Sequence, residues 1–130
     1  MALGGDSLSI RLRRHESGFL LLPCRVDLQL IGSVLPYRFE LMLNTGRPVS
    51  VVSLELRDRL DAFGALDQIS PQFYRVRGVR MDGQLAPQLI VRASSGPRLP
   101  GFQGMLGLQF LESFRQIHFD RDTRLLNLIR

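Results

Sequence analysis

The sequence contains no lysine, and all 17 of its basic side chains are arginines. Against 12 acidic residues they give a formal net charge of +5, a sign that would suit a nucleic-acid surface. The arginines are spread along the chain, however, and aromatic residues do not interleave with them as a base-stacking platform requires. A compositional preference for arginine explains the charge, and nucleic acid is disfavoured as a partner.

Cysteine and histidine are scarce. Cys24 is the single cysteine, so no intrachain disulfide can form. It lies in a strand-like stretch, where we expect a buried thiol and not a nucleophile. His15 and His118 are the only histidines, and with one cysteine they give no metal-ligand cluster of recognisable spacing. The sequence therefore predicts no metal and no cofactor.

Long apolar runs are also absent, since none approaches the roughly 20 residues that span a membrane. In MALGGDSLSIRLRR the charges follow a weak apolar stretch, the reverse of a signal peptide. We therefore expect a cytoplasmic protein with no membrane partner. With 130 residues, 45% of them hydrophobic, the chain is expected to form one domain over residues 1–130, in which residues 1–8 are candidates for disorder.

Alternation of polar and apolar residues, the period of a β-strand, recurs along the chain. It marks residues 9–13, 24–30, 34–43, 73–81, 84–92, 116–119 and 125–129. Ile31-Gly32-Ser33 predicts the turn of a hairpin that joins 24–30 to 35–43, and Asp82-Gly83 predicts the turn of a second hairpin. Pro87 marks the return strand of that second hairpin as an edge or a bulge.

Two segments have the features of short helices. Ser53 is a suitable N-cap for a helix over 54–60, in which Glu55 and Arg59 form an i,i+4 pair. The spacing of Phe110, Leu111 and Phe114 suits a second helix with one buried face. The stretches 65–72 and 93–103 are expected to be irregular. Many short strands with two short helices predict an all-β fold, mainly β with a barrel or sandwich arrangement.

Two short motifs interrupt this strand pattern. The apolar run Leu41–Leu43 leads into Asn44-Thr45-Gly46, and a second apolar run, Val49–Val52, follows almost at once. Further along, Met105-Leu106-Gly107 leads into the second predicted helix, which begins Leu-Gln-Phe-Leu. The first motif taken alone also reads as an ordinary polar turn.

Taken together, the two motifs resemble those of the retropepsin-like aspartic peptidases, the family of retroviral proteases and their single-domain bacterial and cellular relatives. The likeness extends from about Phe19 to the C-terminus, because the order and spacing of the elements match as well. It implies a retropepsin-like acid-protease barrel and a symmetric homodimer, to which each subunit contributes one aspartate. The two carboxylates share a proton, so that one activates a water while the other polarises the peptide carbonyl.

The resemblance also assigns the site residue by residue. Asn44 stands where the family has its catalytic aspartate, and Thr45 and Gly46 complete that motif. Because an amide does not ionise near neutral pH, Asn44 cannot act as the base. The substrate-binding positions that follow from the same comparison are Arg47, Val49, Met105, Leu106 and Gly107.

Two further features depart from the family pattern. Arg47 takes the place of a small residue after the motif glycine. The glycine-rich hairpin that closes the family's site, the flap, corresponds either to the predicted hairpin 73–92 or to a shortened segment within 65–72.

Three functions remain open at this point, and the sequence leaves the enzymatic status uncertain. The first is a catalytically inactive, homodimeric module that binds a peptide or protein. The second is a genuine aspartic endopeptidase that carries an inactivating Asp-to-Asn substitution. The third is a small basic β-barrel that binds nucleic acid.

Overall fold

A computed structural model describes residues 7–94 and 103–130 of the chain. These residues form one large sheet, one small sheet and two helices. The strands are β1 (Ser7–Arg11), β2 (Arg13–Arg14), β3 (Leu20–Leu30), β4 (Ser33–Leu43), β5 (Ser50–Ser53), β6 (Leu66–Gln68), β7 (Phe73–Val76), β8 (Val79–Met81), β9 (Gln84–Leu85), β10 (Leu89–Ser94), β11 (Gly104–Leu106), β12 (Gln116–Asp120) and β13 (Leu125–Ile129). The helices are α1 (Leu54–Ala62) and α2 (Leu108–Glu112).

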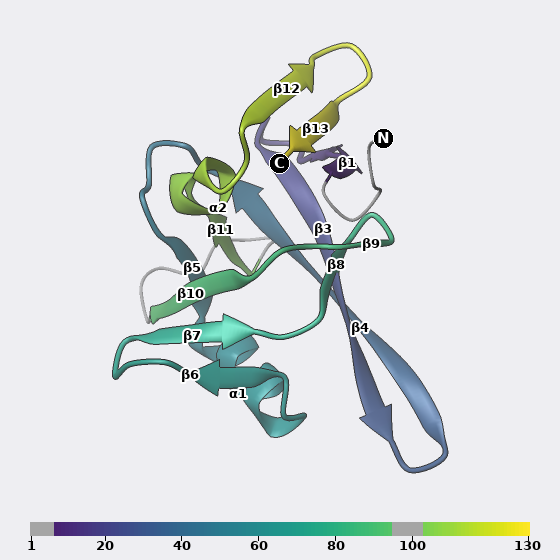
Figure 1. Ribbon diagram of the computed structural model, residues 1–130, viewed down its shortest axis with the longest axis vertical. Coiled ribbons are helices and arrows are strands. Elements are labelled where there is room, and N and C mark those ends of the chain that lie inside the picture. Colours follow the sequence, from purple (N-terminus) through teal and green to yellow (C-terminus); the bar gives the residue numbers. More distant parts are fainter. Residues whose placement is uncertain (1–6, 95–102) are drawn as a thin grey trace.

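The large sheet has ten strands and curves around the core (Figure 1). Its order is β6-β7-β10-β5-β11-β4-β3-β8-β9, with β2 paired to β3 beside this path. A separate three-stranded sheet, in the order β1-β13-β12, brings the two ends of the described chain together. The prediction of an all-β fold with two short helices is confirmed.

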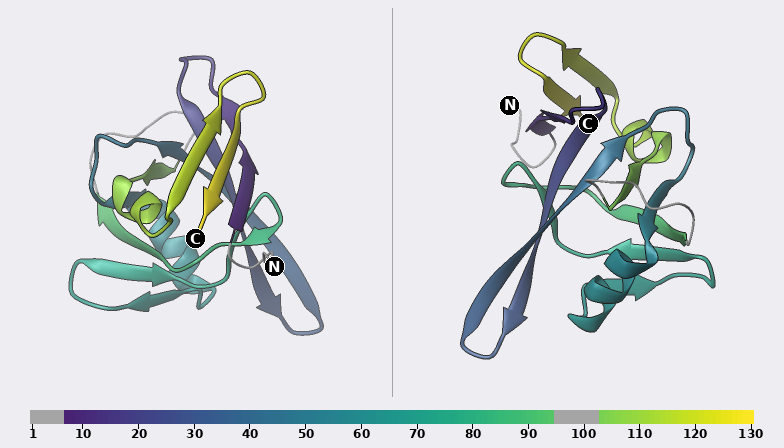
Figure 2. Two further views of the ribbon diagram at one scale, coloured as in Figure 1. Left: turned by 45° about the horizontal axis from the view of Figure 1, so that its top comes forward. Right: turned by 180° about the vertical axis from the view of Figure 1, so that it is seen from behind.

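The longest element is the β3–β4 hairpin, whose far end projects from the body of the molecule (Figures 1 and 2). Its turn contains Gly32, whose φ of 77° lies in the left-handed region that favours glycine. Cys24, Val26 and Leu28 are buried, as their alternation predicts. The predicted hairpin is confirmed, with β4 beginning two residues earlier than expected.

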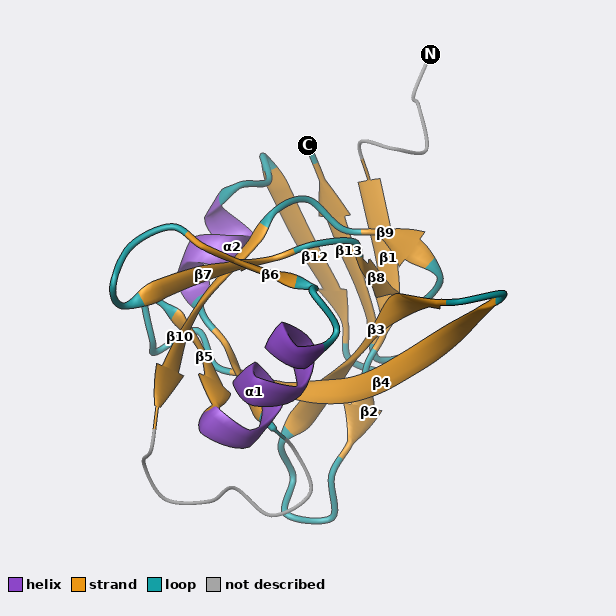
Figure 3. Ribbon diagram, turned by 90° about the horizontal axis from the view of Figure 1, so that it is seen from below, coloured by secondary structure: helices purple, strands orange, loops and turns teal. Residues whose placement is uncertain are grey.

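Helix α1 forms as its sequence predicts. The hydroxyl of Ser53 accepts a hydrogen bond from the Leu56 N–H at 3.1 Å, which satisfies one of the free donors of the first turn. Arg59 lies 3.5 Å from Glu55 across one turn. Leu56 and Leu60 are buried, and the helix packs against β5, β6 and β10. The two helices occupy separate positions on the strand-built body (Figure 3).

The region 65–92 differs in part from expectation. The stretch 65–72 is not wholly irregular, because Leu66–Gln68 forms β6 against β7. The predicted strand 73–81 is divided at Gly78, whose φ is 65°, into β7 and β8. The return strand, for which Pro87 predicted an edge or a bulge, is divided around that proline. Its first part, β9, is at the edge of the large sheet, whereas β10 lies inside it between β7 and β5. The turn at Asp82-Gly83 is confirmed by the pairing of Met81 with Gln84.

The ends of other predicted elements also move. The alternation of residues 9–13 corresponds to β1 and β2, separated at Leu12, which is buried and donates to the carbonyl of Arg124. Residues 7 and 8, candidates for disorder from the sequence, belong to β1, while residues 1–6 lie outside the described part. The predicted loop 93–103 begins later than expected, since β10 continues to Ser94, and its residues 95–102 lie outside the described part.

A single large cluster of apolar side chains fills the inside of the curved sheet, with Ile10, Leu22, Leu41, Leu60, Val91 and Leu106 at its centre. A smaller cluster of Leu21, Met42 and Met105 lies on the other face of the sheet. Within residues 7–94 and 103–130, no helix has the length and apolar character needed to cross a membrane.

Candidate functional site

The two sequence motifs meet because strand β11 lies between β4 and β5. Met105 and Leu106 pair in parallel with the end of β4, and Gly104 and Met105 pair antiparallel with β5. The Asn44 N–H donates to the carbonyl of Leu106 at 3.0 Å. At the other side of the loop, the Leu108 N–H donates to the carbonyl of Arg47 at 2.7 Å. The two glycine-containing loops are thus in contact through their backbones.

The side chain of Asn44 is half-buried and uses both ends of its amide. Its Oδ1 accepts a hydrogen bond from the Gly46 N–H at 3.0 Å, which closes a small turn over Thr45. Its Nδ2 lies 3.4 Å from the sulfur of Met105, which acts as a weak acceptor. The amide is therefore fixed at the point where the two loops touch.

Gly107 is one of the glycines that this junction requires. A Cβ atom there would lie 2.6 Å from the carbonyl carbon of Val49 and 2.9 Å from the backbone nitrogen of Ser50. At Gly46, by contrast, a Cβ would meet only the Oδ1 of Asn44, at 3.2 Å, and Gly46 does not have a positive φ. The close backbone approach that excludes side chains occurs at the second motif and not at the first.

Ser50 is a supporting residue that the sequence analysis did not single out. Its side-chain Oγ accepts a hydrogen bond from the Gly107 N–H at 2.9 Å, inside the protein. It is the one buried polar side chain among the described residues, with 2% exposure. The available signal was a hydroxyl placed between Val49 and Val51 in an otherwise apolar strand.

The remaining predicted site residues divide into buried and accessible ones. Leu106 is completely buried, so its link to the site runs through its backbone carbonyl. Val49 and Met105 are half-buried, whereas Thr45 and Arg47 are exposed. Neither the Thr45 hydroxyl nor the Arg47 guanidinium has a hydrogen bond or ion pair with another residue of the described ranges.

Glu40, the acidic residue nearest to Asn44 in sequence, forms an ion pair with Arg13. Its two carboxylate oxygens accept from the Arg13 guanidinium at 2.7 and 2.6 Å. The hydrogen bond to Glu40, followed by the charge of that carboxylate, raises the pKa of Arg13. In the part of the chain that the structure describes, no group of three or more His, Cys, Asp or Glu residues could hold a metal ion.

Two turns, β6–β7 and β8–β9, lie within the two segments that the sequence offered as equivalents of the flap. The β8–β9 turn is held on β1: Asp82 accepts from the Arg11 N–H at 3.1 Å, and Gln84 exchanges two hydrogen bonds with the backbone of Ser9. This turn lies on the opposite side of the molecule from the loop 44–49, whereas the β6–β7 turn lies on the same side as that loop (Figures 1 and 2). Of the two turns, only the β6–β7 turn, within 65–72, is on the side of the loop 44–49.

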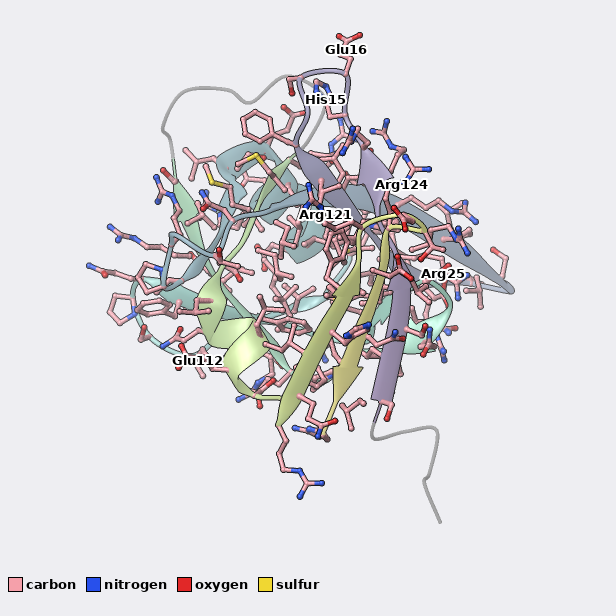
Figure 4. All side chains as sticks on the ribbon, turned by 90° about the horizontal axis from the view of Figure 1, so that it is seen from above. His15, Glu16, Arg25, Glu112, Arg121 and Arg124 are labelled. Atoms are coloured by element: carbon pink, nitrogen blue, oxygen red, sulfur yellow. The ribbon has the colours of Figure 1, made fainter. Side chains whose placement is uncertain are left out.

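A second location is a groove of about 540 Å³ on the outer face of β8, β3 and β4. Arg80, Arg25 and Arg38 stand opposite one another across these three strands. The Nε of Arg25 lies 3.1 Å from Asp27 but makes no well-oriented hydrogen bond. Figure 4 shows Arg25 at the periphery, away from Glu112 of α2. Glu40 and Asp82 also line the groove, so its charge is mixed.

No family model and no curated protein matches the sequence of this chain. Its structure is similar to that of a retropepsin-like aspartic protease from Rickettsia conorii, with a TM-score of 0.58 and 18% identity over 95% of this chain and 91% of that one. It is also similar to the retroviral protease-like domain of Ddi1 from Leishmania major, with a TM-score of 0.52 and 15% identity over 85% and 87% of the two chains.

These similarities show that the chain has the retropepsin-like fold. The resemblance inferred from the two motifs is therefore confirmed at the level of the fold, over most of both chains. At 18% and 15% identity the similarities do not by themselves transfer an activity, a substrate or a partner.

Proposed function

We propose that this retropepsin-like chain is a homodimeric domain without peptidase activity that binds a peptide or protein. An aspartic peptidase needs a pair of carboxylates that share a proton. A symmetric dimer of this chain would place two Asn44 amides at that position, and neither amide ionises near neutral pH.

The contact between Asn44 and Met105 is the observation that carries this proposal. The amide nitrogen is a donor and the thioether sulfur is a weak acceptor, so the two groups are complementary at 3.4 Å. A carboxylate at the same position would turn only acceptor oxygens toward the sulfur. The surroundings of residue 44 thus fit an amide better than an ionised aspartate.

Arg47 supports the same conclusion. It lies three residues after Asn44, is exposed, and has no counter-ion among the described residues. A positive charge beside a pair of carboxylates favours the ionised form of both, which opposes the shared proton that the peptidase mechanism needs.

Two hydrogen-bonding features that have no partner within the described part of one chain support homodimer formation. The exposed Thr45 hydroxyl next to Asn44 has no partner among the described residues and is available for a hydrogen bond to the second subunit if the proposed two-fold axis passes near the loop. The outer edge of β12 is unpaired within the described strands, and exposed edges favour association. Light scattering at micromolar concentration should give twice the 14.8 kDa of one chain, and a concentration-independent mass of one chain would contradict the dimer.

The alternative is a genuine aspartic endopeptidase with an inactivating Asp-to-Asn substitution. We would incubate the protein, Asn44→Asp and Asn44→Asp/Arg47→Ala with a mixed peptide library over acid to neutral pH, and follow cleavage by mass spectrometry. The proposal expects no turnover by the protein as it is and little or none by Asn44→Asp. Robust acid-optimum turnover by Asn44→Asp alone, blocked by an aspartic-peptidase inhibitor, would establish the endopeptidase instead. Mass spectrometry of residue 44 controls for deamidation.

Nucleic-acid binding remains a second candidate because of the arginine row in the groove. Arg25 and Arg80, however, share Asp27 at 3.1 and 3.9 Å, and Glu40 and Asp82 line the same groove. A gel shift that weakens steeply with added salt would favour this candidate, because phosphate contacts release counter-ions.

A further inference from the structure

A row of directly paired residues crosses the large sheet from the loop that contains Asn44. Met105 of β11 is opposite Val51 of β5, Val51 is opposite Arg92 of β10, and Arg92 is opposite Phe73 of β7. Residues that are directly opposite in neighbouring strands point to the same face. These four residues, together with Asn44, are named the site face here.

The site face is the side of the sheet that the core does not cover. Arg92 is exposed, and Val51, Met105 and Phe73 are half-buried. Their neighbours along the same strands point the other way and are buried: Val52, Val91 and Leu106 are at most 1% exposed. The Asn44 amide joins this face through its contact with Met105. From Asn44 the site face thus continues over the apolar side chains of Met105 and Val51 to the guanidinium of Arg92.

Two arginines on and beside the site face have no carboxylate partner in the described part of the chain. Arg92 makes no ion pair with a carboxylate among the described residues, and neither does Arg47 in the adjoining loop. Two carboxylates on the same side of the sheet, Glu40 of β4 and Asp67 of β6, are each already paired with another arginine.

We propose that the site face binds an acidic peptide in an extended conformation, with Arg92 and Arg47 taking its carboxylates; this rests on the proposed peptide-binding function. Neighbouring strands are roughly 4.8 Å apart, so Arg92 lies two strand spacings, roughly 10 Å, from Met105. About three residues of extended peptide cover that distance. An apolar peptide side chain then packs on Met105 and Val51, while an acidic one reaches Arg92.

Arginine suits this role because its planar guanidinium forms two parallel hydrogen bonds to a carboxylate. Both guanidiniums are exposed, so each contact is screened by water and salt. We therefore expect each arginine to contribute two- to about five-fold in affinity, the range of exposed ion pairs. In a homodimer the two subunits would present two copies of each arginine to one peptide.

The test uses three fluorescein-labelled octapeptides that share an apolar centre of Leu-Phe-Val and differ only in two flanking residues, which are Glu, Gln or Lys. Fluorescence anisotropy measures their affinity for the protein at low and high salt. The Glu peptide should bind most tightly and should lose its advantage at high salt. Arg92→Gln and Arg47→Gln should each weaken the Glu peptide two- to about five-fold and leave the Gln peptide unchanged.

Arg121→Gln, in the exposed turn between β12 and β13, is the matched control and should change nothing. Equal affinity for the Glu and Gln peptides, a preference for the Lys peptide, or an unchanged Glu affinity in Arg92→Gln would overturn the acidic preference while leaving peptide binding intact. Failure of all three peptides to bind would overturn peptide binding on this face altogether. Circular dichroism confirms that the variants remain folded.

Discussion

The side-chain amide of Asn44 lies 3.4 Å from the sulfur of Met105, although the two residues are 61 positions apart in the sequence. This contact ties the loop after β4 to strand β11 at the point where the family's catalytic aspartate would stand. Because a neutral amide donates to the sulfur and an ionised carboxylate cannot, the pair distinguishes between the two side chains at residue 44.

Asn44→Asp should lower the free energy of unfolding by about 0.5–1 kcal/mol at neutral pH, the low end of the range for a hydrogen bond. Below the carboxyl pKa the loss should shrink, because the protonated side chain can again donate to Met105. Urea unfolding at both pH values measures the effect. In a protein that already carries Met105→Leu, the sulfur is absent, so Asn44→Asp should lower the free energy of unfolding by less. An equal decrease with and without Met105→Leu would contradict an interaction between Asn44 and Met105.

Gly107→Ala should destabilise the protein by about 2 kcal/mol or more, since its Cβ would collide with the backbone of Val49 and Ser50 at 2.6 to 2.9 Å. Gly46→Ala is the matched control from the first motif. Its Cβ would meet one side-chain oxygen at 3.2 Å, so we expect a loss several times smaller. Thermal unfolding of the two variants measures the difference. A larger loss of stability in Gly46→Ala than in Gly107→Ala would mean that the sterically required glycine is in the first motif.

Ser50→Ala should cost about 1–3 kcal/mol, because it leaves the Gly107 N–H buried without its acceptor. Ser33→Ala, at an exposed position at the start of β4, provides the comparison and should lie within about 0.5 kcal/mol of the parent protein. Denaturant titration checks both. A Ser50→Ala protein as stable as Ser33→Ala would mean that the hydrogen bond adds nothing to the junction.

The Cys24 thiol should not react with iodoacetamide or with a disulfide reagent in the folded protein at mildly alkaline pH. Burial, and secondarily the charge of Glu40, raises the pKa of Cys24, so the reactive thiolate is scarce. Cys24 is among the residues that line the groove over β8, β3 and β4. It is only 3% exposed, however, so the reagent cannot reach its thiol. Labelling should reach one equivalent in guanidinium chloride, and rapid labelling without denaturant would contradict the burial.

Local chemistry determined much of this protein before any long-range contact was known. Alternation predicted the β3–β4 hairpin, the turn residues predicted the bend at Asp82-Gly83, and the Ser53 cap predicted where α1 begins. Each of these depends on residues close together in the chain, which is why the pattern sufficed. The two motifs that meet in the site were also visible in the sequence, through their resemblance to a known family.

Other features were decided only by the tertiary structure. The insertion of β11 between β4 and β5 creates both the Ser50–Gly107 hydrogen bond and the steric requirement for Gly107. Likewise, the single alternating pattern over 73–81 forms two strands, because the chain turns at Gly78. Strand β7 pairs with β6 and β10, whereas β8 pairs with β3 and β9. The row from Met105 to Phe73 joins four strands that are distant in sequence. Strand periodicity records which side chains share a face of one strand, but it does not record which strands become neighbours.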